Sequence, residues 1–176
     1  MMPANHALQR PIRRGVAVAI VVSRAPGRLY KCLRTMAVTE IAQARKCGQI
    51  RFHAVYQYPV DLNRILAMCY LKPEAERLLE ISRDEAVRVL VCWLHRDAAY
   101  KSELMSADLA LSLAESFVRE FADETSRFFT NGRWHDSERP QNWQPLTESV
   151  FDGGVLIESG KGNDTRHVCI WFEDED

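Results

Sequence analysis

Residues whose types could do chemistry gather between positions 92 and 97. His95-Arg96-Asp97 has the letters of the protein-kinase catalytic loop, but the chain has no glycine-rich phosphate loop with its lysine and no Asp-Phe-Gly. Cys92 and His95 are three residues apart, which places both on one face of a helix, yet a zinc site needs three or four ligands. We therefore interpret Cys92 as a core thiol and His95 as a residue at the polar edge of a helix.

Carboxylates near the C-terminus form a second candidate group. Asp152, His167 and Glu173 could form the site of a small hydrolase, and the terminal acids could supply ligands for Mg²⁺. Residues 160–162 (Gly-Lys-Gly) resemble a fragment of a phosphate loop, but they lie between two expected strands, whereas a true phosphate loop connects a strand to a helix. We predict no catalytic residue, no metal ligand and no cofactor, and we keep the hydrolase as an alternative.

The charge of the chain is distributed unevenly. Its net charge is −1, but residues 1–54 carry ten Lys/Arg and one acid, whereas residues 55–176 carry 13 Lys/Arg and 23 acids. The five cysteines are odd in number and form no C-x-x-C pair, which disfavours a disulfide framework and favours a reducing compartment. No window approaches the roughly 18 apolar residues needed to span a bilayer. We expect a cytoplasmic protein that has no membrane contact and binds a basic protein.

The first 35 residues differ from the rest in composition. Arginines precede an apolar run at 15–22, and this stretch allows three interpretations. It resembles a secretory or twin-arginine export signal; it reads as a buried, β-branched strand at 16–22; or residues 1–35 are a basic leader or disordered arm before a functional start at Met36. We predict an arm or leader at 1–35, which could contact nucleic acid, and a single α+β domain at 36–176.

Apolar periodicity and capping residues predict the elements of that domain. Ser82 and Glu85 form a capping box, and Ser106 caps the longest helix. The expected helices are 37–47, 61–70, 73–80, a helix from 82 that carries 86–94, and 107–130; the expected strands are 49–58, 155–158 and 168–172. The predicted fold class is α+β, with a helical core at about 61–131 packed on a small antiparallel β-sheet that ends in a C-terminal hairpin.

The segment from Asn142 to Asp176 resembles the C-terminal region of small bacterial proteins of unassigned function, some of them of the toxin-immunity type. The resemblance rests on Trp143, Pro145, Thr147, Phe151-Asp152 and Trp171-Phe172-Glu173-Asp174. It implies a protein that neutralises another protein and identifies no binding residue.

The sequence therefore predicts an acidic protein-binding module, an immunity- or antitoxin-like inhibitor of a basic partner. Complementary charge would speed association, and tryptophans in a polar loop could anchor the partner, although loop tryptophans also pin loops to a core. The candidate binding residues are Trp134, Trp143, Asp152, Glu173, Asp174 and Glu175. A component of a larger assembly, with residues 1–35 as its arm, is the other alternative.

Overall fold

The computed structural model describes residues 17–23, 36–56, 61–134, 142–161 and 165–174. These residues form one six-stranded sheet in the order β1-β2-β6-β5-β4-β3. The strands are β1 (Ala17–Ser23), β2 (Gln49–Tyr56), β3 (Leu79–Ile81), β4 (Arg127–Thr130), β5 (Phe151–Ser159) and β6 (Arg166–Asp174). The β1–β2 pair is parallel and every other pair is antiparallel, so the central sheet is built around the β5–β6 hairpin.

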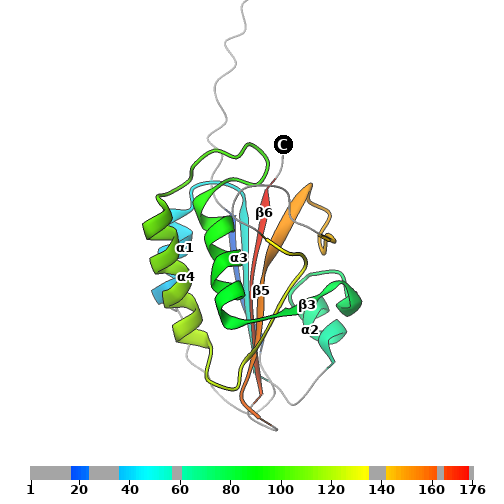
Figure 1. The fold of residues 1–176 in the computed structure, drawn as a ribbon. Helices are drawn as coiled ribbons and strands as arrows, with labels where there is room; N and C mark the ends of the chain where they lie inside the picture. Colours follow the sequence, from blue (N-terminus) through cyan, green and yellow to red (C-terminus); the bar gives the residue numbers. More distant parts are fainter. Residues whose placement is uncertain (1–16, 24–35, 57–60, 135–141, 162–164, 175–176) are drawn as a thin grey trace, which may run out of the picture.

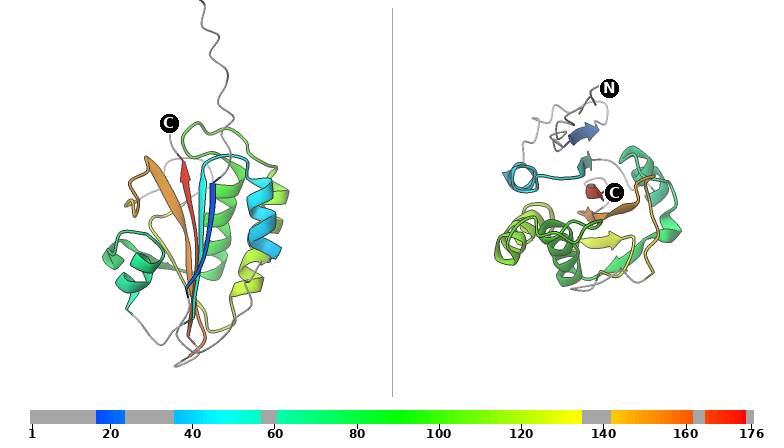
Figure 2. Two further views of the ribbon diagram at one scale, coloured as in Figure 1. Left: turned by 180° about the vertical axis from the view of Figure 1, so that it is seen from behind. Right: turned by 90° about the horizontal axis from the view of Figure 1, so that it is seen from above.

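Helices cover both faces of this sheet unequally. The helices are α1 (Met36–Ala44), α2 (Leu62–Met68), α3 (Arg83–His95) and α4 (Ala107–Phe121), with a short 3₁₀ turn, η1 (Ala75–Arg77). The first, third and fourth helices pack on one face, and α2 with η1 lies on the other (Figures 1 and 2). Within the part of the chain that the structure describes, no helix combines the length and apolar character needed to cross a bilayer.

Side chains along β6 alternate between the two hydrophobic cores. Ile170 and Phe172 belong to the larger core beneath α1, α3 and α4, whereas Cys169 and Trp171 belong to the smaller core beneath α2. Successive residues of a strand point to opposite faces, so a single apolar run supplies both layers. The predicted α+β class, with helices packed on a sheet that ends in a C-terminal hairpin, is confirmed.

Two glycines of β5 allow large rings to approach the sheet. A Cβ on Gly153 would lie 2.7 Å from Trp93 Nε1 and 2.6 Å from Trp134 Cζ2. A Cβ on Gly154 would lie 2.1 Å from the carbonyl oxygen of Ile170. The glycine pair therefore allows tryptophan packing on one face and close pairing with β6 on the other.

The capping predictions are confirmed. The Ser82 hydroxyl accepts a hydrogen bond from Glu85 N, and a Glu85 carboxylate oxygen accepts one from Ser82 N, which completes the capping box of α3. The Ser106 hydroxyl accepts a hydrogen bond from Leu109 N at the start of α4.

Two of the helix predictions are wrong: one helix is shorter than expected, and another expected helix does not form. The expected helix 107–130 ends at Phe121, because the Asp123 carboxylate accepts hydrogen bonds from Thr125 in a turn and residues 127–130 form β4. The expected helix 73–80 is instead η1 followed by β3, which pairs with β4. In both places strand pairing with a distant segment prevailed over the local helical pattern.

Residues 17–23 form a strand, in agreement with the strand interpretation of the apolar run. β1 runs parallel to β2 with Ala17 opposite Gln49 and Ser23 opposite Val55. Residues 1–16 and 24–35 lie outside the described residues, and the boundary at Met36 stays a prediction.

Candidate functional site

The last two described residues, Glu173 and Asp174, are candidate binding residues that a partner could reach only if they were exposed. Glu173 and Asp174 are instead buried, with 3% and 1% of their surface exposed. As neighbours in a strand they point to opposite faces of the sheet, and each meets its own arginine: Arg51 for Glu173 and Arg45 for Asp174. Neither of these two acids is therefore exposed to a partner, and Glu175 lies outside the described residues.

Arg45 is fully buried beneath the helical layer. Its Nη2 donates to both Asp174 carboxylate oxygens at 2.7 and 2.8 Å, its Nε donates to Trp93 O at 3.0 Å, and its Nη1 donates to Cys47 O at 2.8 Å. The guanidinium also lies 5.1 Å from the ring centroid of Phe172. Every nitrogen of this buried cation has an acceptor, which is the condition for keeping such a charge in a protein core.

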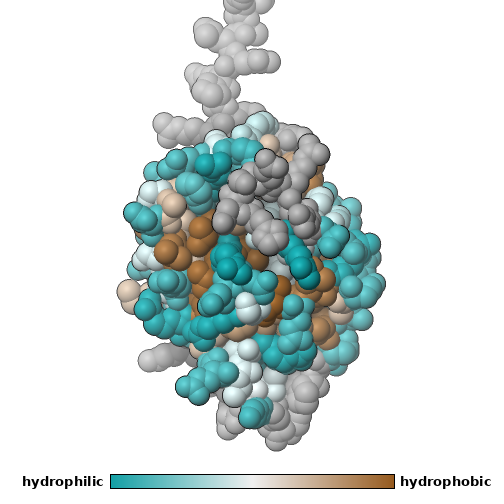
Figure 3. All heavy atoms as spheres, in the orientation of Figure 1, coloured by the Kyte–Doolittle hydropathy of each residue, from teal (hydrophilic) through white to brown (hydrophobic). Residues whose placement is uncertain are grey.

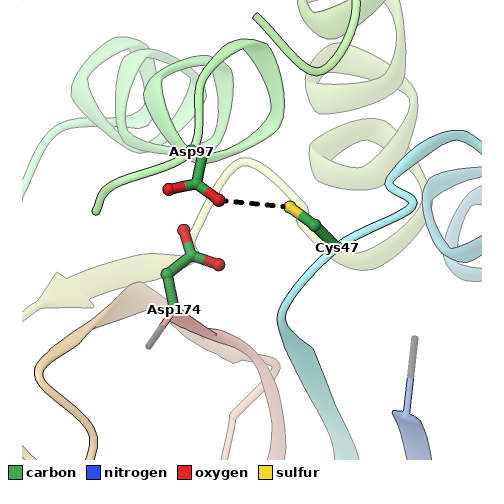
Figure 4. Close-up of side chains that lie close together, drawn as sticks. All are labelled: Cys47, Asp97 and Asp174. Carbon is green, nitrogen blue, oxygen red and sulfur yellow. Dashed lines mark hydrogen bonds between the residues drawn. The ribbon is translucent and has the colours of Figure 1, made fainter. Parts of the chain in front are cut away.

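Asp97 and Cys47 extend this ion pair into a polar cluster. The Cys47 thiol donates to Asp97 Oδ2 at 3.5 Å (Figure 4). Asp97 Oδ1 accepts from two backbone amides, Ala99 N and Tyr100 N. Asp174 Oδ2 accepts from Ala98 N at 2.8 Å. The segment after α3 therefore closes over the end of β6 through its backbone amides.

The same cluster is the one group of described residues that could hold a metal ion. Donor atoms of Cys47, Asp97 and Asp174 lie within 4.8 Å of one another. Two observations disfavour it as a ligand set: Arg45 already holds Asp174 through both carboxylate oxygens, and burial, opposed by the Arg45 charge, raises the pKa of the Cys47 thiol to about 11. A metal binds the thiolate, so the cluster fits an internal network better than a metal site.

On the other face of the sheet, the Arg51–Glu173 pair lies at the base of an open polar groove. The groove has a volume of about 530 Å³, with Gln49, Arg51 and Glu173 at its base and residues 70–72 and 146–149 among its walls. Lys72 N donates to Leu146 O at 2.8 Å, which ties the two walls together. This is a volume in the range of small-molecule sites.

Arg51 is held in place at the base of this groove. Its Nε and Nη2 donate to the two oxygens of Glu173, and its Nη1 donates to Tyr70 O at 3.0 Å. Ser149 Oγ donates to Glu173 Oε2 at 2.7 Å, so the carboxylate is held from two sides. The hydrogen bonds to Glu173 raise the pKa of Arg51, which therefore remains a cation.

Asp152, predicted as a binding residue, organises the loop that precedes β5. Its carboxylate accepts from Asn131 Nδ2, Leu146 N and Thr147 N at 2.9, 2.7 and 2.5 Å, and the residue is fully buried. Burial raises the pKa of Asp152, and the amide donors oppose that rise. The geometry gives this carboxylate a structural role in one wall of the groove.

Both loop tryptophans pack against the core. Trp134 lies edge-on to Trp93 with ring centroids 5.0 Å apart. Trp143 stacks on Phe151 and donates from Nε1 to Asp152 O at 2.8 Å. The interpretation that these side chains pin the loop therefore matches their contacts.

The residues of the hydrolase alternative do not form one site. Asp152 is opposite Glu173 in the β5–β6 pair, but His167 is opposite Glu158, six residues along β6. Six residues of a strand span about 20 Å. His167 Nε2 lies 3.0 Å from Glu158 Oε2, so it has a different carboxylate as its partner.

Two further histidines have local environments in the structure. His95 Nδ1 lies 2.7 Å from Met105 O, at the polar edge of α3 as expected. His53 is buried in β2, its ring lies 5.4 Å from that of Tyr70, and neither ring nitrogen has a hydrogen-bond partner among the described residues. His135 lies outside them.

His53 gives the fold a pH dependence of definite sign. Burial, assisted by the charge of Arg51, lowers its pKa from 6.5 to about 4. Between pH 6.5 and 4, the His53 side chain is therefore protonated in the unfolded chain but neutral in the folded chain. The free energy of unfolding falls as the pH decreases through this range, by at most about 3 kcal/mol. Urea denaturation at pH 7 and pH 4.5 should show this loss in the parent protein and a smaller loss in His53→Leu. Equal losses in the two proteins would contradict the assignment.

The outer surface of α1 and α4 is acidic. The two helices carry four acids and one base: Glu40, Asp108, Glu115, Glu120 and Arg119, all of them exposed. Leu109 and Leu111 of α4 are also exposed, at 44% and 43%. The face of the molecule that carries α3 and α4 shows brown apolar patches surrounded by hydrophilic residues (Figure 3).

Sequence reasoning missed Arg45, Arg51 and Lys72. The partners of the two arginines lie far along the chain: Asp174 is 129 residues after Arg45, and Glu173 is 122 residues after Arg51. We find no matching family model, no matching curated protein and no matching solved structure. The resemblance of residues 142–176 to toxin-immunity proteins therefore stays a prediction, and only the geometry bears on function.

Proposed function

We propose that the chain is an acidic protein-binding module, an immunity- or antitoxin-like inhibitor of a basic partner protein, which acts in the cytoplasm. The observation that supports this proposal best is the acidic outer surface of α1 and α4, where four acids accompany one base and two exposed leucines. We call this surface the acidic helical face.

The acidic helical face replaces the C-terminal acids as the docking surface. Glu173 and Asp174 are buried against arginines, so a partner would gain little from their charge. Asp108 and Glu115, by contrast, are seven residues apart on α4, which puts them on the same exposed side of the helix. Exposed charges of one sign attract a basic partner over a distance of about 8–10 Å at physiological salt and raise the association rate.

The two leucines supply the apolar contact that charge alone does not give. Leu109 and Leu111 flank the row of outward-facing acids on α4. A protein interface needs an apolar centre that excludes water, with charges around its rim. The face has both components. The charges would mainly set the association rate, and the two leucines would mainly set the lifetime of the complex.

A matched pair of charge reversals tests the proposal. The full chain serves as bait in the native host, as the parent protein, as Glu115→Lys and as Glu76→Lys; Glu76 is an exposed acid of η1 on the opposite side of the sheet. We expect one stoichiometric basic partner that the parent and Glu76→Lys retain at low salt and that Glu115→Lys loses. Equal retention by Glu115→Lys and Glu76→Lys would contradict the acidic helical face as the docking surface.

A further inference from the structure

We propose that the groove above the Arg51–Glu173 pair binds the carboxylate of a small ligand at Lys72. The groove lies on the α2 side of the sheet, away from the acidic helical face, so this proposal is independent of the inhibitor function. It rests on two features of the groove: Arg51, which is held in place at the base, and Lys72, whose carboxylate partner Glu148 is exposed and exchangeable.

Lys72 has a carboxylate partner that a ligand can replace. Its Nζ lies 3.0 Å from Glu148 Oε1, but the Glu148 side chain is 91% exposed and that of Lys72 is 30% exposed. An exposed pair of this kind is weak, because water solvates both charges and holding two long side chains costs entropy. The Glu148 carboxylate therefore occupies the position that we assign to the ligand carboxylate, next to the Lys72 ammonium.

Arg51 adds a second, preorganised group. An arginine has five N–H groups, and three hydrogen bonds from Arg51 go to Glu173 and Tyr70, which leaves two N–H groups with no acceptor among the described residues. Because the Glu173 side chain is buried and also accepts a hydrogen bond from Ser149, the guanidinium is held before any ligand arrives. Holding the group in advance removes part of the entropy cost of binding.

The charges of the groove favour a monoanion. Glu173 offsets the charge of Arg51, and the displacement of Glu148 would leave one uncompensated positive charge at Lys72. A carboxylate matches that single charge, whereas a phosphate dianion would exceed it. The Ser149 oxygen, with its proton directed to Glu173, remains able to accept a hydrogen bond from a donor on the ligand.

The test is an NMR titration of the full chain with sodium acetate, with ionic strength held constant by NaCl. The parent protein should show saturable shifts of the backbone amides at 70–72 and 147–149. Lys72→Gln should weaken binding at least tenfold. Glu148→Gln should strengthen it by about two- to fivefold, because it removes the tethered competitor. Lys161→Gln, an exposed lysine in the β5–β6 loop, is the control and should leave binding unchanged.

Opposite signs for Lys72→Gln and Glu148→Gln separate ligand binding from a structural role. Loss of a merely structural ion pair would change binding in the same direction in both variants. Absence of saturation in the parent, an unaffected Lys72→Gln, or weaker binding by Glu148→Gln would each overturn the proposal. Tighter binding of inorganic phosphate than of acetate in the same titration would overturn the choice of a carboxylate.

Discussion

Arg45→Ala is expected to lower the free energy of unfolding by about 3–5 kcal/mol, the cost of leaving a buried charge without its partner. The substitution removes both hydrogen bonds to Asp174, the bond to Trp93 O and the stacking on Phe172, all inside the core. Among the described residues, the Asp174 carboxylate would then keep its hydrogen bond from Ala98 N. Urea denaturation monitored by tryptophan fluorescence measures the change.

Two further variants show that this loss comes from an unpaired charge. Arg119→Ala removes an exposed arginine of α4 and should stay within about 0.5 kcal/mol of the parent. The double variant Arg45→Met with Asp174→Leu removes both charges, and should recover most of the stability lost in Arg45→Ala, because apolar residues of similar volume replace buried pairs well. A double variant no more stable than Arg45→Ala would show that shape, and not charge, sets the loss.

Trp93→Ala is expected to cost about 3–5 kcal/mol, the range for truncation of a large buried aromatic residue. Trp93 is 1% exposed, stacks on Phe172 with ring centroids 5.9 Å apart, and lies edge-on to Trp134. Its backbone oxygen also accepts from Arg45, so the residue joins α3 to the sheet and to the buried ion pair. Such a loss is a large fraction of the stability of an ordinary domain.

Thermal and urea denaturation should give the same loss of stability for Trp93→Ala, and Tyr100→Ala serves as the comparison. Tyr100 is 58% exposed, so its truncation should change stability by about 0.5 kcal/mol or less. A Trp93→Ala loss as small as that of Tyr100→Ala would contradict the position of α3 against the sheet.

Elements with short-range signals could be predicted from the sequence. The start of α3 follows from Ser82 and Glu85, three residues apart, and β2 follows from the alternation that begins at Gln49. The strand at 127–130 was missed, since Phe128 lies seven residues after Phe121 and so continues the apolar stripe of the helix, whereas the segment becomes a strand through pairing with β3 and β5. That pairing is non-local, so no pattern in the segment itself reports it.

The ion pairs within the fold account for part of the uneven charge distribution along the sequence. The sequence divides into a basic part and an acidic part, which indicated an external basic partner. In the structure, two bases of the first part, Arg45 and Arg51, bond two acids of the second, Asp174 and Glu173. Part of the asymmetry is therefore complementarity within the fold, and only exposed acids such as Asp108 and Glu115 remain for a partner.

The most direct test of the inhibitor proposal is the association rate constant of the purified partner as a function of salt. For the parent protein and Glu76→Lys, the rate constant should fall steeply and equally between 20 and 300 mM NaCl, values at which the screening length drops from roughly 20 Å to about 6 Å. Glu115→Lys should associate several-fold more slowly at low salt, and the difference should shrink at high salt. A rate constant that is independent of salt, or unchanged by Glu115→Lys at 20 mM NaCl, would contradict the acidic helical face as the surface that binds the partner.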